Sequence, residues 1–282
     1  MAMDEKGLGK RLQLARQNAG MTQQQLCQKA NLSFSTLTKI ERGAIKSPSI
    51  FTVQAIAIAI GVSLDKLIGN NPVVERKLLK TKSGVTFVYF DVNGCLVHFY
   101  QRAFAKLAQA SGVPSDIVET AFWHYNDEVC RGSITMKDFN AYIAERMEID
   151  SVDWMKYYME CVEPIGEMHK ILRWAIERYK VGLLTNIMPG QLRAMMVSGD
   201  LPNLTYDAII DSSELGTIKP ENQIYEIATE RAGCPPEQIL LIDDTRSNIK
   251  AAEKQGWKVL WFDDARLEEA VDQVREVLET AE

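Results

Sequence analysis

The spacing of apolar residues changes character about a third of the way along this 282-residue chain. Up to residue 68, apolar positions recur at helical spacing and predict five short helices, at 7–19, 23–30, 34–41, 50–60 and 64–68. From Val85 onward, short apolar runs typical of buried strands alternate with helical segments. These runs cover residues 85–90, 181–184, 209–210 and 239–242. The pattern therefore predicts an all-α region followed by an α/β region with a parallel sheet.

These patterns predict a multidomain chain. We expect a five-helix bundle with a helix-turn-helix layout at residues 1–70, a basic linker acting as a tether at 71–84, and an α/β domain at 85–282. A helical insertion at about 96–162 interrupts the Rossmann-like α/β pattern after the first strand and holds most of the aromatic residues. Ligands of parallel α/β sheets bind at the carboxyl ends of the strands. The insertion is therefore expected to form an α-helical cap over that edge.

The charge is distributed unevenly between the two regions. Residues 1–82 carry 13 Lys and Arg against 5 Asp and Glu, a net charge of +8, and the rest of the chain carries −14. A basic module in an acidic protein favours a polyanion as the partner of the first region. The five cysteines form no CxxC pair, no apolar stretch reaches ~18 residues, and the start shows no apolar signal region. We therefore expect a cytoplasmic protein with no membrane partner.

Three motifs in the first region occur in order and at a characteristic spacing. They are Met21–Leu26 (MTQQQL), Ser33–Gly43 (ending IERG) and Gly61–Ile68 (GVSLDKLI). Together, over residues 7–69, they resemble the Cro/XRE-type phage-repressor family. The resemblance implies a double-stranded DNA operator as partner and a third helix that enters the major groove. A single small module rarely binds tightly enough alone, so a homodimer on two half-sites is expected. A module used only for packing or dimerisation is the alternative.

The resemblance also implies which residues contact DNA. Gln23, Arg42 and Lys46 are expected at the phosphate backbone, where they give affinity without sequence choice. The candidates for contact with the bases are Phe34, Ser35, Thr36, Thr38 and Lys39. The apolar residues between them, Leu26, Leu37 and Ile40, are expected in the core of the bundle.

Polar residues suited to a phosphate or a metal ion end each apolar run of the second region. They are Asp91, Thr185-Asn186, Lys219 and Asp243-Asp244. Because the carboxyl ends of parallel strands meet at one edge of the sheet, these side chains are expected to lie together. Carboxylates, a hydroxyl and an ammonium group are the parts needed to hold Mg²⁺ and a phosphoryl group.

Four segments around these residues resemble the motifs of the haloacid dehalogenase superfamily, over residues 85–265. They are Phe90–Leu96, Leu184–Asn186, Gly216–Glu221 and Ile242–Ala252, and the segment Arg131–Thr135 resembles the superfamily's helical cap. The resemblance implies a catalytic set of Asp91 as nucleophile with Asn93, Thr185 and Lys219. It implies Mg²⁺ as cofactor, held by Asp91, the backbone carbonyl of Asn93 and Asp244, with Asp243 and Asn248 in support. It implies a phosphate site of Thr185, Asn186 and Lys219, and ligand selection by Trp123, His124, Tyr125 and Arg131.

One residue departs from the phosphatase pattern of that superfamily. Asn93 occupies the position where phosphatases carry an Asp that shuttles protons, a contribution worth roughly 10²–10⁴-fold in rate. The favoured hypothesis is a DNA-binding regulator whose second domain senses a phosphorylated ligand or mediates dimerisation. A Mg²⁺-dependent phosphohydrolase with a DNA-binding appendage and a switch that keeps a phosphoryl group on Asp91 are the alternatives. Dehalogenation is disfavoured because the pair Asp243-Asp244 persists.

Overall fold

The computed structural model describes residues 8–62, 64, 67 and 78–279. The chain divides into two compact units, residues 1–76 and 77–282. Each unit has its own hydrophobic core, and each is considered by itself below. No helix of the described residues is long and apolar enough to cross a bilayer.

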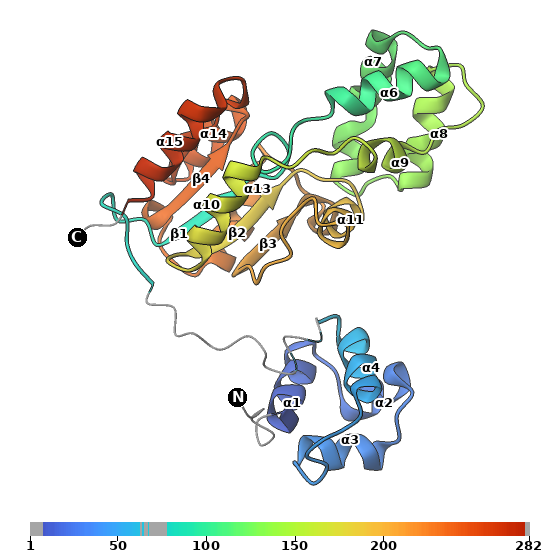
Figure 1. Ribbon diagram of the computed structural model, residues 1–282, viewed down its shortest axis with the longest axis vertical. Coiled ribbons are helices and arrows are strands. Elements are labelled where there is room, and N and C mark those ends of the chain that lie inside the picture. Colours follow the sequence, from blue (N-terminus) through green and yellow to red (C-terminus); the bar gives the residue numbers. More distant parts are fainter. Residues whose placement is uncertain (1–7, 63, 65–66, 68–77, 280–282) are drawn as a thin grey trace. The chain divides into compact units, whose positions relative to one another are not determined.

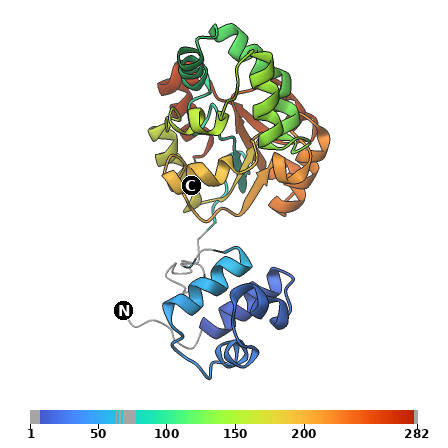
Figure 2. The ribbon, with the colours of Figure 1, turned by 90° about the vertical axis from the view of Figure 1, so that its right-hand side faces the viewer.

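The first unit is all-α, as the hydrophobic periodicity predicted. Its described helices, drawn in blue in Figures 1 and 2, are α1 (Leu8–Asn18), α2 (Gln23–Ala30), α3 (Phe34–Glu41) and α4 (Ile50–Ile60). Most of the predicted fifth helix, 64–68, lies outside the described residues.

Hydroxyl side chains begin three of these helices. The Thr22 hydroxyl accepts a hydrogen bond from the Gln25 backbone amide, and the Gln25 side chain accepts one from the Thr22 amide, which completes a capping box. Ser33 and Ser49 cap α3 and α4 in the same way, without the reciprocal bond. Such caps stabilise a short helix by about 1 kcal/mol each. Inside the bundle, the three residues expected in its core are fully buried: Leu26, Leu37 and Ile40.

The second unit is built on a parallel sheet of five strands in the order β3-β2-β1-β4-β5. The strands are β1 (Phe87–Phe90), β2 (Lys180–Thr185), β3 (Ala208–Asp211), β4 (Ile239–Asp243) and β5 (Lys258–Trp261). The order changes direction at β1, the central strand, whose neighbours are β2 and β4. A ligand site is expected at such a switch point, outside the carboxyl ends of these strands.

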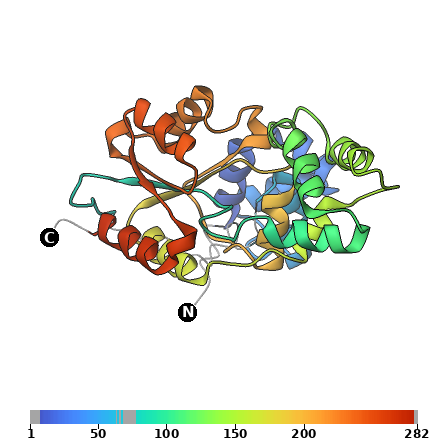
Figure 3. The ribbon, with the colours of Figure 1, turned by 90° about the horizontal axis from the view of Figure 1, so that it is seen from above.

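Helices cover both faces of the sheet, and alternate residues of each strand point to opposite faces. Val88 and Phe90 of β1 belong to the core shared with α10 (Gly166–Ile176) and α15 (Leu267–Val277). Phe87 and Tyr89 belong to the other core, shared with α13 (Asn222–Ala232) and α14 (Arg246–Lys254). Figure 3 shows the sheet between these two helical layers. Burial on both faces explains why the strands read as continuous apolar runs.

Four helices inserted after β1 form a lobe beside the sheet, at the position predicted for the cap (Figure 1). They are α6 (Gln101–Ser111), α7 (Ser115–Cys130), α8 (Met136–Arg146) and α9 (Trp154–Met159). Buried rings, among them Phe122, Trp154 and Tyr158, fill the lobe. The remaining elements are α11 (Gln191–Ser198), α12 (Ser212–Leu215) and two 3₁₀ turns, Pro236–Gln238 and Asp264–Arg266.

Residues 71–84 were predicted to be a tether, but the second half of this segment is bound to the α/β unit. The Leu79 amide donates to the carbonyl of Arg178, and the Lys82 amide donates to the carbonyl of Glu279. Thr81 is buried, and its hydroxyl accepts a hydrogen bond from the Val85 amide. These bonds make residues 79–84 part of the α/β unit, while the first half of the predicted linker, 71–77, lies outside the described residues.

Candidate functional site

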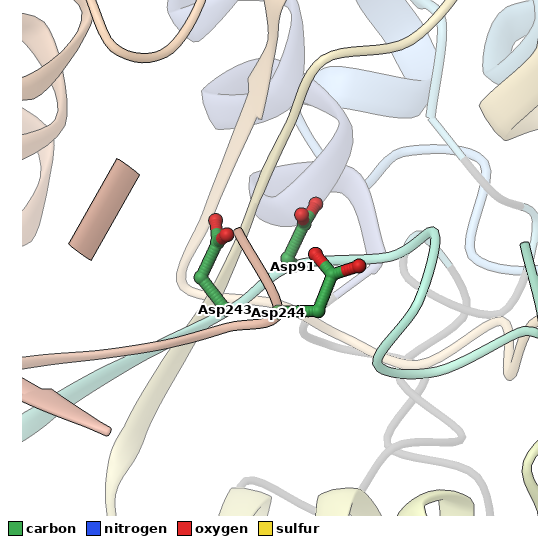
Figure 4. A group of neighbouring side chains, drawn as sticks. All are labelled: Asp91, Asp243 and Asp244. Carbon is green, nitrogen blue, oxygen red and sulfur yellow. The ribbon is translucent and has the colours of Figure 1, made fainter. Parts of the chain in front are cut away.

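Three carboxylates meet where β1 and β4 end. Asp91 follows β1 directly, and Asp243 and Asp244 stand at the end of β4. The Asp91 amide donates to the carbonyl of Ile242, so the pairing of the two strands sets the distance between the carboxylates. One oxygen of each carboxylate lies within 4.8 Å of the others. Figure 4 shows the three side chains projecting to the same side of the strand ends.

Lys219 lies between two of these carboxylates. Its Nζ is 2.8 Å from Asp91 Oδ2 and 2.6 Å from Asp243 Oδ2, and the side chain is fully buried. Burial opposes the charge of Lys219, but the Asp243 and Asp91 carboxylates outweigh it and raise the pKa of the ammonium group. Lys219 is therefore a permanent cation in this site.

Asp243 has a supporting position. Besides Lys219, its oxygens accept hydrogen bonds from Asn248 Nδ2, at 3.0 and 3.2 Å, and from the Thr245 amide, at 2.8 Å. Its side chain is fully buried and does not line the cleft described below. Asp243 thus orients Lys219 and Asn248, while Asp91 and Asp244 face the cleft.

The site carries more negative than positive charge. Burial, and next the other carboxylates, raise the pKa of Asp91 despite the Lys219 ion pair, because the single ammonium is shared. Burial and the neighbouring Asp243 raise the pKa of Asp244 to about 6. A divalent cation would relieve this repulsion, and hard oxygen ligands of this kind suit Mg²⁺. The Asp91 and Asp244 carboxylates therefore fit a Mg²⁺ site, and the expected third ligand, the Asn93 carbonyl, stays a prediction.

Gly94 allows the first loop to approach Asp244. Its φ is +85°, and a Cβ built on Gly94 would lie 2.1 Å from Asp244 Oδ2. Any other residue would therefore push the Asp244 carboxylate aside or strain the backbone. A glycine at this point is part of the geometry that brings Asp244 beside Asp91.

The residues expected to bind phosphate surround the same point. Thr185, the last residue of β2, is fully buried, and its hydroxyl has no hydrogen-bond partner among the described residues. Thr185 is not among the residues that line the cleft described below, so its role in binding phosphate stays a prediction. Asn186 exchanges two side-chain hydrogen bonds with the Lys219 backbone, at 2.7 and 2.8 Å. Asn186 therefore fixes the loop that carries Lys219.

Asn93 is held by two tyrosines of the cap. Its Nδ2 donates to the Tyr100 hydroxyl at 3.1 Å, and its Oδ1 accepts from the Tyr158 hydroxyl at 3.0 Å. All three side chains are at least nine-tenths buried. Burial raises the pKa of Tyr100 well above its usual range, so this hydroxyl does not ionise near neutral pH. The group therefore offers no base in the place where phosphatases of the superfamily have a carboxylate.

A cleft of about 360 Å³ connects these residues to the cap. Its lining from the core includes Asp91, Asn93, Asn186, Lys219, Pro220, Asp244, Thr245, Ser247 and Asn248. The cap contributes Phe99, Tyr100, Trp123, Asn126 and Asp127. Sequence reasoning found Trp123 but missed the other four.

Three further cap residues were expected to select the ligand, and none of them lines the cleft. They are His124, Tyr125 and Arg131. Arg131 pairs with Glu221 instead, so its charge is directed to the loop that follows Lys219. The periodicity of a helix does not show which side of α7 faces the core, and this explains the error.

In the first unit, the candidate DNA-contacting residues of α3 fall into two groups. Phe34, Ser35 and Lys39 are exposed, as are Arg42 and Lys46 beyond the helix. Thr36 and Thr38 differ from these, because a direct contact with a base needs an accessible hydroxyl that is not already engaged. The Thr36 hydroxyl bonds the Ser33 hydroxyl at 2.8 Å, and the Thr38 hydroxyl is buried without a partner.

Gln23 belongs to a buried polar network. Its Nε2 donates to Glu41 Oε2 at 2.7 Å, and Arg16 bonds both oxygens of the same carboxylate at 2.7 and 3.1 Å. Arg16 also donates to the carbonyl of Met21 at 2.7 Å. The network ties α1, α2 and α3 together, and sequence reasoning missed it. Because the Gln23 side-chain amide is engaged by Glu41, a phosphate contact at this position would use the backbone amides at the N-terminus of α2.

Comparison with known proteins finds a matching family for each of the two units. The haloacid dehalogenase-like hydrolase family matches residues 86–256, and the helix-turn-helix family matches residues 12–67. The immunity repressor protein of Bacillus phage phi105 is 36% identical over 70 residues, which are 25% of this chain and 48% of that protein. Acyl-CoA dehydrogenase family member 10 of Mus musculus is 24% identical over 203 residues, 68% of this chain and 19% of that protein. The chain thus spans less than half the length of these curated relatives.

Solved structures agree on the fold of the second unit. A haloacid dehalogenase family enzyme from Bacteroides thetaiotaomicron, in complex with magnesium and inorganic phosphate, matches with a TM-score of 0.56 and 21% identity. The match covers 65% of this chain and 96% of that one. The chain therefore joins a Cro/XRE-type helix-turn-helix domain to an α/β domain of the haloacid dehalogenase fold.

Proposed function

We propose that this chain, which belongs to the haloacid dehalogenase-like hydrolase family, is a DNA-binding transcription regulator whose α/β domain binds a phosphorylated ligand without efficient turnover. The first unit is proposed to bind an operator as a homodimer, and the second to bind the ligand with Mg²⁺. The relative solved with magnesium and inorganic phosphate supports that choice of ion and ligand group.

The surroundings of Asn93 carry this proposal. Its amide is neutral, and both its polar atoms are occupied by buried tyrosine hydroxyls. Activation of water to clear a phosphoryl group from Asp91 needs a base near that position. Asp91 and Asp244, whose carboxylates lie together, are proposed to hold the metal ion, and Lys219, paired with Asp91, to neutralise the phosphoryl charge. A site with binding groups and no base is suited to sensing.

Phosphate release tests the proposal directly. Wild type, Asn93→Asp and Asp91→Asn would be compared with Mg²⁺ and an aryl phosphate such as 4-nitrophenyl phosphate. We expect negligible release by wild type and Asp91→Asn, and a gain of about 10²-fold or more in Asn93→Asp, because the new carboxylate restores proton transfer. Turnover by wild type that Asp91→Asn abolishes would contradict the proposal.

That contrary outcome would support the second candidate, a Mg²⁺-dependent phosphohydrolase with an attached DNA-binding domain. The ion pairs of Lys219 with Asp91 and Asp243 favour it, since they place a nucleophile and a charge-neutralising group together. A stable phosphoryl group on Asp91 is distinguished by intact mass. Incubation with Mg²⁺ and acetyl phosphate would add one phosphoryl group to wild type and none to Asp91→Asn if the switch operates.

DNA binding is tested with a random double-stranded oligonucleotide library selected over several rounds on the purified full chain. We expect a sequence preference and affinity that falls with salt, because Lys39, Arg42 and Lys46 are exposed cations. Arg42→Ala is expected to reduce the salt dependence by about one phosphate contact. Lys106→Ala, an exposed cation of the second unit, is the control. Binding without sequence preference or salt dependence would contradict the regulator hypothesis.

Sedimentation of the selected complex would give its stoichiometry. Two chains on one DNA duplex with two half-sites are expected, since a single small module contacts too few bases for tight binding. One chain per duplex would contradict the proposed homodimer.

A further inference from the structure

The two walls of the cleft differ in their chemistry. The core wall carries the groups proposed to hold Mg²⁺, Asp91 and Asp244, and the ammonium group of Lys219. The cap wall carries aromatic rings, the Asn126 amide and a single carboxylate, Asp127. A phosphorylated ligand held at the core wall would therefore place its organic part against a surface of rings and negative charge.

Three rings of the cap wall contact one another. Phe99 and Trp123 are stacked, with ring centroids 5.7 Å apart and an interplanar angle of 9°. The Tyr100 ring lies 4.5 Å from Phe99 and 6.3 Å from Trp123. Trp123 nevertheless remains 45% exposed. Trp123 also lines the cleft, and an indole within reach of a ligand attracts cations through the quadrupole of its ring.

Asp127 lies one helical turn after Trp123 on the same face of α7. It is exposed, and no cation among the described residues forms an ion pair with it. Its Oδ1 accepts a hydrogen bond from Asn126 Nδ2 at 3.3 Å, which holds the carboxylate beside the cleft. The nearest cation along the chain, Arg131, is paired with Glu221. The cap wall thus presents a negative charge without a cationic partner among the described residues.

We propose that the cleft selects small phosphomonoesters whose organic part carries a cationic ammonium group. This inference rests on the proposed function, because it needs the phosphoryl group to bind at the core wall. With Mg²⁺ bound, the two charges of the ion offset the excess of carboxylates over Lys219, so a phosphate dianion can reach the ion and Lys219 without net repulsion. The ammonium group would then meet Trp123 and Asp127. The cleft of about 360 Å³ limits the ligand to a small molecule.

Other phosphorylated compounds fit this wall less well. A sugar phosphate could donate hydroxyl hydrogen bonds to Asp127 but would bring no positive charge to it. A second carboxylate or phosphate on the ligand would face Asp127 and be repelled. The charge of Asp127, more than the shape of the cleft, therefore sets the ligand class.

Isothermal titration of the full chain with Mg²⁺ tests the inference through a matched pair of ligands. Phosphocholine and 3,3-dimethylbutyl phosphate have the same shape and differ in the charge of the quaternary centre. We expect phosphocholine to bind about fivefold tighter or more. Trp123→Leu and Asp127→Asn are expected to remove most of that preference. Glu128→Gln, which changes the next carboxylate on α7 outside the cleft, is expected to keep it.

Inorganic phosphate separates failure of this inference from failure of the proposed function. If inorganic phosphate binds with Mg²⁺ but the two organic phosphates bind equally, the core wall functions and the inference on ligand class is wrong. The inference is also wrong if the preference survives in both Trp123→Leu and Asp127→Asn. If neither inorganic phosphate nor either ester binds, the proposed phosphate site itself is wrong.

Discussion

Arg16 in the first unit and Lys219 in the second are both buried cations, but their surroundings differ in charge. Arg16 has one carboxylate partner, Glu41, and neutral acceptors for its other bonds. Lys219 has two carboxylate partners, Asp91 and Asp243, and Asp244 lies beside them. The first arrangement is balanced and ties helices together. The second keeps excess negative charge, which indicates a site that awaits a cation.

The balanced pair is the place where one substitution should have the largest effect. Glu41→Ala leaves Arg16 buried without its partner, and breaking such a pair costs about 3–5 kcal/mol. A bundle of this size has little stability to spare, so we expect the first unit to unfold or nearly so. All five tryptophans lie in the second unit. During chemical denaturation, the circular dichroism signal of the variant should therefore lack the transition of the first unit. The transition seen by tryptophan fluorescence, which reports on the second unit, should stay unchanged.

A matched control for this experiment is Gln24→Ala, an exposed position on α2. It should leave both signals unchanged. A loss below about 1 kcal/mol in Glu41→Ala would mean that water reaches Arg16, and that the pair is not the structural element described here.

The unbalanced site should respond in the opposite direction. The pKa of Asp244 lies above its ordinary value in the folded chain, so the ionised carboxylate opposes folding at neutral pH. Asp244→Asn should therefore stabilise the metal-free second unit, by an amount on the order of 2 kcal/mol. Wild type should gain about 2.7 kcal/mol from Mg²⁺ at 100 times its dissociation constant, and the variant much less.

Tryptophan fluorescence during denaturation, with and without Mg²⁺, measures both effects of Asp244→Asn. Asp150→Asn, an exposed acid of the cap outside the cleft, is the control. A variant that is less stable than wild type without Mg²⁺ would show that Asp244 has a structural role and that the excess charge is not costly.

Local features of the sequence predicted much of this architecture. Asp91, Thr185 and Asp243 stand at strand ends because each apolar run stops at a polar residue, and a parallel sheet brings such ends to one edge. Thr22 and Ser33 begin helices for similarly local reasons, because each hydroxyl accepts a hydrogen bond from an amide three residues later. Patterns of this kind depend on neighbouring residues alone, which is why one sequence shows them.

Partners far apart in the chain were not predictable. Tyr158 bonds Asn93 across 65 positions, and Arg131 bonds Glu221 across 90. Which side chain meets which depends on how the cap packs on the core, and periodicity carries no information on that. Gln23 illustrates the same limit, because its expected phosphate-binding amide is engaged by Glu41.

A neutral buried contact should be worth less than either charged site. Tyr158→Phe removes the hydroxyl that donates to Asn93 Oδ1 and leaves that oxygen buried without this donor. We expect a loss of about 1–3 kcal/mol in the second unit, measured by tryptophan fluorescence during denaturation. Tyr157→Phe, at the half-buried neighbouring position, should be neutral. Equal stability of the two variants would show that Tyr158 does not hold Asn93.

The smallest effect is expected where an ion pair is exposed. Lys106 Nζ lies 2.5 Å from Glu160 Oε2, as close as the buried pairs, but both side chains are more than 40% exposed. Water and salt screen such a pair, and fixing two long side chains costs entropy. Lys106→Ala should therefore leave the fluorescence transition unchanged at low and at high salt. A clear loss of stability at low salt would contradict the contrast between the buried ion pairs of Arg16 and Lys219 and an exposed pair. The distance between the charges, rather than their burial, would then decide how much an ion pair contributes to stability.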